Sequence, residues 1–500
     1  MKHKKDSVMK KINFLFVVAA FSCFLPSLFA KRGERCVVIV STGFNDDGKS
    51  KITLKLAKKA DAIVRSQIAS WNTHTGQKGN EVFQCYLLPP AIIRKNVECF
   101  FTQGMDLDCK QLLDEIELFE KKGFELKGRL WISSRSHIVM PYHRYLAELD
   151  NQKGRRKTHD FSPERRGISW CAADKRLRGG IRVADIMNEK TRNQRIKEMV
   201  EYANIVIKEV YGGTHIDVKE VQKEYADYAQ RIKPYVSDLV EINLNKMLAA
   251  GKSVIVEATG GMFLDVGLGT VPFVSPSSTT VQGALVGSGI AIKRVGEVIG
   301  VVKAYGTRSG KGPFPTEIKD PAILDNFKKT IQKNFKDRSE ANIIKYDTHT
   351  VPFLSASNEL EKNCEMLCEC DKDMRFGWLD LILVREAILI NGIDTLALTM
   401  LDNLDDFEEI FVCYDYVLDG VNLDHLPPLA EDAARVKPRY MKFKGWKTST
   451  QNIKKFSDLP EEARYFVKKI EMLCNNTPIN YISVGPDNSQ IIVVQESLIL

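Results

Sequence analysis

Short, continuous runs of apolar residues alternate along the chain with longer stretches in which apolar residues recur every three or four positions. The short runs predict buried strands and occupy residues 36–42, 253–258, 297–303, 395–401 and 409–416. The longer stretches predict helices at residues 49–65, 109–122 and 191–211. Buried strands that alternate with helices are typical of an α/β fold, in which helices cover both faces of a largely parallel central sheet.

Length and composition set limits on the domain organisation. The chain has 500 residues, of which 44% are hydrophobic and 27% charged, a balance typical of a globular protein. This length allows one large α/β domain or two to three ordinary domains. Because no segment has the composition of a linker, we expect residues 31–500 to form one elaborated domain. The charged segment 319–365 is expected to be a surface excursion from it.

Residues 1–30 have the three-part order of a secretory signal peptide. Five lysines precede an apolar run from Phe14 to Phe29, and Ala30 provides a small residue at the expected cleavage position. The run is short for a membrane span, and Pro26 interrupts it. We therefore expect export, to a periplasm or out of the cell, with no stable membrane span after cleavage. An uncleaved anchor, a misassigned start and a cytoplasmic location are the alternatives.

Charge and cysteine content exclude little but point away from two classes of function. The net charge of +8 becomes +4 when residues 1–30 are removed, which is too mild to indicate nucleic-acid binding. The basic clusters at 155–157 and 165–166 fit either a nucleotide-phosphate patch or a solvated face. The Cys364, Cys368 and Cys370 cluster lacks the second pair that a metal site would require.

A candidate phosphate-binding loop lies between the first predicted strand and the first predicted helix. Residues 43–50 read GFNDDGKS and match the pattern G-x-x-x-x-G-K-[ST]. Backbone amides in such a loop approach phosphate oxygens, and Lys49 adds a positive charge. Asp46 and Asp47 would repel phosphate unless one of them binds Mg²⁺ or accepts a proton. An ordinary glycine turn into a helix is the alternative.

Several segments in the same order resemble the adenylosuccinate synthetase family over about residues 35–495. They are STGFNDDGKSK at 41–51, the glycine-rich segment 253–280, KAYGTRSGKGPFPTEI at 303–318, GWLD at 377–380 and ISVGPDN at 482–488. The resemblance implies the P-loop-like nucleotide-binding architecture of that family. It also implies a ligase of the purine pathway that uses GTP and Mg²⁺ to join IMP and L-aspartate, working as a homodimer.

The resemblance assigns roles to individual positions. Asp46 falls on the family's catalytic base and Mg²⁺ ligand, His74 on its general acid, and Thr73 on a residue whose carbonyl also holds Mg²⁺. Arg178 falls on the arginine that reaches the IMP phosphate from the other subunit, and Ser275 on a phosphate-binding threonine. The remaining positions are Gly48, Lys49, Thr75, Asp402, Ser483 and Gly485 for GTP, and Lys372 and Arg375 in the aspartate loop.

Some substrate-facing positions differ from the family pattern. Trp71 replaces an asparagine and Gly260 a glutamine, both contacts to IMP, and Met400 replaces a lysine at the guanine site. The aspartate loop, T-T-G-R-R-R-R in the family, reads ECDKDMR at residues 369–375. Two interpretations follow: a working adenylosuccinate synthetase, or an exported nucleotide-binding paralogue whose activity is altered or lost.

Overall fold

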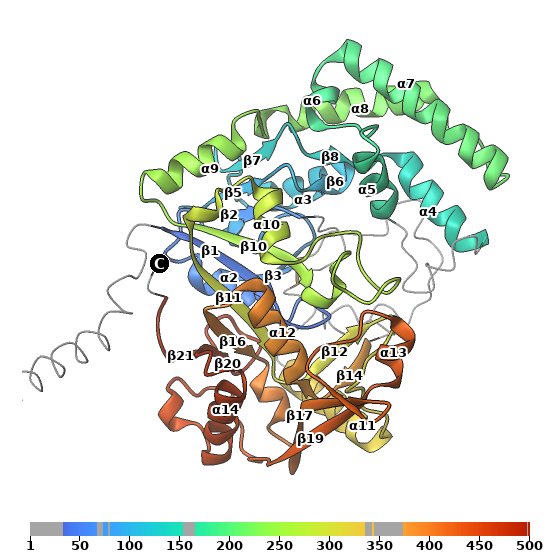
Figure 1. Ribbon diagram of the computed structural model, residues 1–500. Coiled ribbons are helices and arrows are strands. Elements are labelled where there is room, and N and C mark those ends of the chain that lie inside the picture. The colour runs from blue at the N-terminus through green and yellow to red at the C-terminus, as the bar shows by residue number, and fades with distance from the viewer. Residues whose placement is uncertain are drawn as a thin grey trace, which may run out of the picture.

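A ten-stranded sheet forms the centre of the molecule (Figure 1). The structure is a computed structural model that describes residues 34–67, 74–78, 81–153, 166–335, 343–344, 374–497 and 499–500. All neighbouring strands of this sheet are parallel except the last pair, β20 and β21. Across the sheet the strands are β21 (Ile491–Val493), β20 (Ile479–Ser483), β16 (Thr395–Thr399), β11 (Val295–Lys303), β1 (Cys36–Ser41), β10 (Val254–Gly261), β2 (Ala62–Arg65), β5 (Glu98–Phe101), β7 (Leu130–Ser133) and β9 (Val236–Ser237).

Both faces of this sheet are buried, which explains why its strands are apolar without alternation. In β1, Val38 and Val40 belong to one hydrophobic core, whereas Val37 and Ile39 belong to the other. Helices α9 (Val240–Ala249), α10 (Val281–Ser288), α12 (Leu381–Asn391) and α14 (Glu461–Leu473) contribute to the first core. Helices α2 (Lys49–Leu56), α3 (Cys109–Lys121), α4 (Pro141–Lys153), α7 (Glu189–Ile205) and α8 (Val218–Ile232) contribute to the second.

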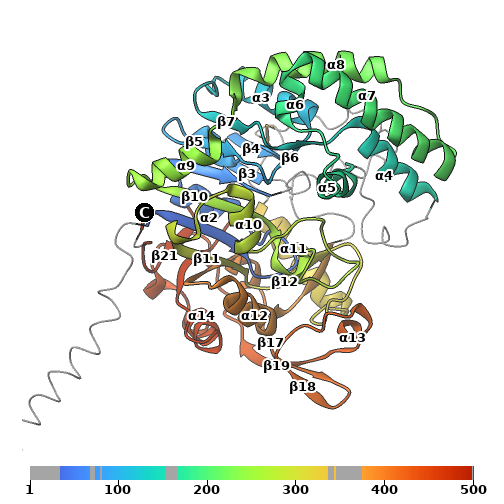
Figure 2. The ribbon, with the colours of Figure 1, turned by 45° about the horizontal axis from the view of Figure 1, so that its top comes forward.

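Further elements surround the central sheet (Figure 2). Among them, α5 (Ile168–Arg176), α6 (Val183–Met187), α7 and α8 lie at one end of the molecule, while α11 (Pro321–Phe335) and α13 (Ala430–Arg435) lie towards the other. A mixed sheet contains β15 (Leu379–Asp380), β17 (Glu409–Leu418), β18 (Val421–Leu423) and β19 (Lys437–Lys444). The other pairings involve β3 (His74–Lys78), β4 (Glu81–Cys85) and β13 (Ile343–Ile344), then β12 (Gly306–Ser309) with β14 (Met374–Gly377), and β6 (Asp106–Leu107) with β8 (His137–Ile138).

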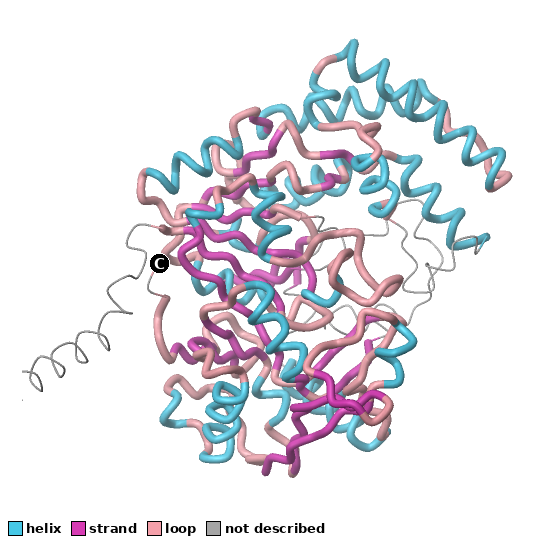
Figure 3. Tube along the Cα trace, viewed as in Figure 1, coloured by secondary structure: helices cyan, strands magenta, loops and turns pink. Residues whose placement is uncertain are grey.

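The arrangement confirms the α/β class and most predicted elements (Figure 3). One predicted helix is wrong over half its length, because α2 ends at Leu56 and residues 62–65 form β2. The exposed Lys58 and Lys59 mark a turn that separates the two elements. The strand predicted at 409–416 exists, but β17 pairs with β15, β18 and β19 instead of joining the central sheet.

The segment expected to be a surface excursion is partly regular. Its first part forms α11, and Phe327 and Ile331 of this helix are buried in the core. Apolar residues at helical spacing explain this anchoring. In the part of the chain that the structure describes, no helix combines the length and apolar character needed to cross a bilayer. The cysteine cluster at 364–370 lies outside the described residues.

Candidate active site

The predicted phosphate loop leaves β1 at the carboxyl edge of the central sheet and leads into α2. Asp47 and Gly48 both have left-handed backbone angles, with φ of 54° and 84°. The Asp47 carboxylate turns inward and accepts a hydrogen bond from the Gly43 amide at 3.1 Å. The Thr399 hydroxyl donates to the Asp47 carbonyl at 2.7 Å. Asp47 therefore has a structural role, in which its carboxylate and carbonyl hold the backbone of the loop.

Asp46 and Lys49 form an ion pair inside the same loop. The distance from Lys49 Nζ to Asp46 Oδ2 is 2.8 Å, and Lys49 is completely buried while 22% of the Asp46 side chain is exposed. Lys49 Nζ also donates to the Gly260 carbonyl at 2.7 Å and to Ser41 Oγ at 2.9 Å. The lysine is thus held at the loop by three segments, and its charge is balanced internally. To bind a phosphate, the Lys49 ammonium would have to replace one or more of these contacts with a phosphate oxygen.

His74 lies at the start of β3 in a buried polar cluster. Its Nδ1 lies 2.8 Å from Ser50 Oγ and 2.9 Å from Glu257 Oε1, and its Nε2 lies 2.7 Å from Arg65 Nη1. Because a guanidinium can only donate, Nε2 accepts and the ring proton resides on Nδ1. Burial and the Arg65 charge lower the pKa of His74, although Glu257 acts against them.

Arg65 and Glu257 were not predicted from the sequence. Both are fully buried in neighbouring parallel strands, Arg65 at the carboxyl end of β2 and Glu257 within β10. Their positions are paired in register and their side chains lie 3.2 Å apart. Burial opposes ionisation of Glu257, but His74 and Arg65 hold its pKa low, at about 2. A charge that directly follows an apolar run, as in AIVR and VIVE, is the signal that could have identified this pair.

The residues assigned to the guanine end of GTP adjoin the phosphate loop. Lys51, in α2, donates to Ser483 Oγ at 2.9 Å and also bonds the Gly485 carbonyl. A Cβ on Gly48 would lie 3.6 Å from Thr399 and 3.7 Å from Met400, at the end of β16. Asp402 follows in the turn Leu401–Leu404, where burial raises its pKa to about 6 against the opposing charge of Lys51.

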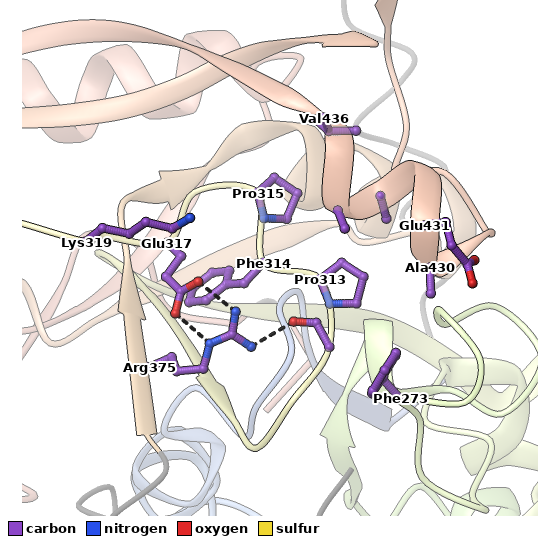
Figure 4. A pocket seen from close by; sticks show the side chains of 13 residues that line it. Phe273, Pro313, Phe314, Pro315, Glu317, Lys319, Arg375, Ala430, Glu431 and Val436 are labelled. Carbon is purple, nitrogen blue, oxygen red and sulfur yellow. Dashed lines mark hydrogen bonds and ion pairs between the residues drawn. The ribbon is translucent and has the colours of Figure 1, made fainter. Parts of the chain in front are cut away.

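Three other predicted residues each make contacts outside the phosphate loop or are exposed. The Ser275 hydroxyl donates to the Leu264 carbonyl at 2.9 Å. Arg178 is exposed just after α5, with a left-handed φ of 65°. Arg375 makes two contacts to Glu317, at 2.6 and 2.8 Å, beside an open pocket of about 560 Å³ (Figure 4). The charge of Arg375 is therefore neutralised where it lies.

Several assignments concern residues that the structure does not describe. Thr73, Trp71 and Lys372 lie outside the described ranges, and only the backbone of Thr75 is placed, opposite Gln84 in the β3–β4 pair. Within those ranges, no group of three or more His, Cys, Asp or Glu side chains could hold a metal ion. The proposed magnesium ligands accordingly stay a prediction.

A buried arginine joins the loops that flank the site. Arg308, in β12, donates to the carbonyls of Pro313 and Phe273, both at 3.0 Å. Its guanidinium also lies 4.1 Å from the ring centroid of Phe44, in the phosphate loop. Burial, together with the nearby charge of Arg375, lowers the pKa of Arg308 to about 9. Arg308 connects three segments that are far apart in the sequence.

Comparison with known proteins gives one consistent result. The family model for adenylosuccinate synthetase matches residues 38–492. The adenylosuccinate synthetase of Thermoanaerobacter pseudethanolicus is 36% identical over 461 residues, which cover 92% of this chain and 99% of that protein. The corresponding protein of Clostridium botulinum is 34% identical over 460 residues, again covering 92% and 99%. A structure of fully ligated adenylosuccinate synthetase from Plasmodium falciparum superposes with a TM-score of 0.79 at 27% identity, covering 93% of this chain and all of that one. The chain belongs to the adenylosuccinate synthetase family.

Proposed function

We propose that this protein is an adenylosuccinate synthetase, a ligase that joins IMP and L-aspartate at the expense of GTP. One observation carries the proposal. The phosphate loop contains the Asp46–Lys49 pair, and His74 and the Asp402 turn adjoin it, although the three come from distant regions of the chain. Loop residues Ser50 and Lys51 make the connections to His74 and to Ser483.

In this proposal the residues of the loop divide the first chemical step between them. The Asp46 carboxylate accepts the proton from N1 of IMP, so that the 6-oxygen can attack the γ-phosphorus of GTP and release GDP. Lys49 opposes the negative charge of the transferred phosphoryl group. The amine of L-aspartate then attacks C6 of the purine, the carbon that bears the phosphorylated oxygen, and phosphate leaves. Asp402 accepts hydrogen bonds from the guanine ring N–H and amino groups.

His74 must change its hydrogen bonding to act as the general acid in this scheme. In the structure its Nε2 accepts from Arg65 and holds no proton to donate. A proton on Nε2 requires that the Arg65 contact be given up, which leaves Glu257 to stabilise the imidazolium through Nδ1. Glu257 is therefore a positioning residue for the acid.

Magnesium fits the charges of this site. Asp46 is the partly exposed carboxylate of the loop, and hard oxygen donors are the ligands that Mg²⁺ prefers. Asp46 and the carbonyl of Thr73 would hold the ion, which when bound neutralises phosphate charge. The chain's own contribution is then to orient GTP through the loop amides and Lys49.

The decisive test is the reaction itself. Purified residues 31–500 are assayed for adenylosuccinate formation from GTP, IMP, L-aspartate and Mg²⁺. Asp46→Asn should abolish turnover. Asp419→Asn, which alters an exposed carboxylate paired with Arg435, should leave it unchanged. An inactive wild-type protein that still binds GTP would instead favour the repurposed paralogue.

We propose in addition that the protein is exported and dimeric. The composition of residues 1–30 supports export, and the N-terminal residue of the native protein, measured by mass spectrometry, tests it. The exposed Arg178 and its neighbour Leu177, which is 72% exposed, support a subunit contact at the end of α5. Light scattering of the purified protein tests the dimer.

A further inference from the structure

Asn334 connects the last turn of α11 with the turn that carries Asp402. Its side-chain nitrogen Nδ2 lies 3.0 Å from Asp402 Oδ2 and 2.9 Å from Asn403 Oδ1. An amide nitrogen has two hydrogens, so both are committed to this turn. Asp402 is itself only 4% exposed, which makes each donor that reaches its carboxylate important.

The position of Asn334 is fixed by its surroundings. Phe327, about two turns earlier on the same face of α11, packs against Tyr305 with ring centroids 5.0 Å apart. The Tyr305 hydroxyl in turn accepts from Asn403 Nδ2 at 2.9 Å. A buried hydrogen-bond chain therefore runs from Asp402 through Asn334 and Asn403 to Tyr305, and it holds the carboxylate in one orientation.

The same turn lacks a cation that the family pattern places there. Met400 occupies the position of the lysine in T-K-L-D, and its sulfur lies 3.5 Å from the Tyr305 hydroxyl. Met400 provides no N–H for Asp402. Lys51 of α2 and Gln451 also lower the pKa of Asp402, and Asn334 adds a neutral donor from α11.

We infer that Asn334 determines the nucleobase preference of this site by fixing the Asp402 carboxylate in one orientation as an acceptor. Guanine presents two donors on this edge, its ring N–H and its amino group, and both require acceptors. Adenine presents a ring nitrogen that accepts, and it would need a protonated Asp402. Since an N–H already points at Oδ2, a proton on that oxygen is disfavoured. The inference rests on the proposed binding of GTP.

The test compares binding of GTP and ATP by the purified full-length protein and its variants. Loss of one hydrogen bond to a charged acceptor is expected to weaken GTP binding by roughly 10- to 100-fold in Asn334→Ala and to leave ATP binding nearly unchanged. The preference for GTP should fall further in Asn334→Asp, because two adjacent carboxylates share a proton. Lys333→Ala is the matched control, since Lys333 is the preceding residue and pairs instead with Asp406.

The outcomes separate this inference from the proposed function. A wild-type protein with no preference for GTP overturns both. A wild-type preference that survives in Asn334→Ala, or that falls equally in Lys333→Ala, overturns the role of Asn334 alone. If Asn334→Ala does not fold, Asn334→Ser keeps a short donor and is expected to retain most of the preference, whereas Asn334→Asp loses it.

Discussion

Replacing Gly261 with alanine should displace the phosphate loop. Gly261 ends β10 and pairs with Ser41, the last residue of β1. A Cβ built on Gly261 would lie 2.3 Å from the Gly43 carbonyl oxygen, and 2.6 and 2.7 Å from the carbonyl oxygen and amide nitrogen of Asn45. All three atoms are backbone, so no side chain can rotate away. The loop must therefore move as a unit.

The size of this displacement gives the expected effect. Carbon atoms rarely approach such atoms more closely than 3.0 Å, so the Gly43 carbonyl must retreat by most of an ångström. A shift of this size at a site that positions phosphate costs about 100-fold in kcat/KM for GTP. Overpacking of the strand edge should lower the free energy of unfolding by about 1–3 kcal/mol.

Adenylosuccinate formation and urea denaturation measure the two effects separately. Gly267→Ala is the matched control, because the nearest atom to its added Cβ is Asp265 Oδ1 at 3.4 Å. A Gly261→Ala protein with the kcat/KM and stability of the wild type would refute the reasoning. It would mean that β10 and the loop adapt without loss.

Three further predictions concern charge and assembly. Lys49→Met should lower turnover at least about 100-fold, because the charge facing the transferred phosphoryl group is lost, and stopped-flow measurement of GDP release checks this. Arg178→Leu and Asp46→Asn should each be inactive, yet mixed subunits should recover about a quarter of the activity if each site draws Arg178 from its partner; no recovery after subunit exchange would oppose a shared site. Glu115 accepts hydrogen bonds from the amides of residues 86–88, and burial raises its pKa to about 7, above its usual value of 4.5. Its contribution to stability is present at low pH and is lost as pH rises through 7, so Glu115→Gln should destabilise the protein by about 2–3 kcal/mol more at pH 5 than at pH 8 in denaturant titrations, and an equal penalty at both would contradict this.

The strand before the phosphate loop, β1, and its neighbour in the sheet, β10, could be predicted from the sequence because their signals are local. Residues 36–42 and 253–258 are continuous apolar runs, and the loop follows the first run with two glycines and a lysine at fixed spacing. Asp402 and Ser483 were predicted only through the family resemblance, from short motifs later in the chain. Their proximity to Lys51 of α2 could not be predicted from those motifs and is seen only in the structure.

Features that depend on pairing between distant segments could not be predicted in this way. The assignment of residues 409–416 to the central sheet failed because an apolar run does not show which strand it will join. The contact of Arg65 with Glu257 joins residues that are 192 positions apart. The second half of the helix predicted at 49–65 was wrong for a local reason, since a short turn between a helix and a strand leaves little trace in the apolar periodicity.

The structural contacts of Arg308 show that a sequence match to the family need not indicate a catalytic role. The KAYGTRSGKGPFPTEI segment is among the best family matches in the chain, yet its arginine spends its hydrogen bonds on the carbonyls of two loops. A structural role of this kind does not depend on the ligation reaction. A family match in this segment therefore reports on the architecture of the protein. Departures from the family pattern at substrate-facing positions such as 71, 260 and 369–375 bear on catalysis instead.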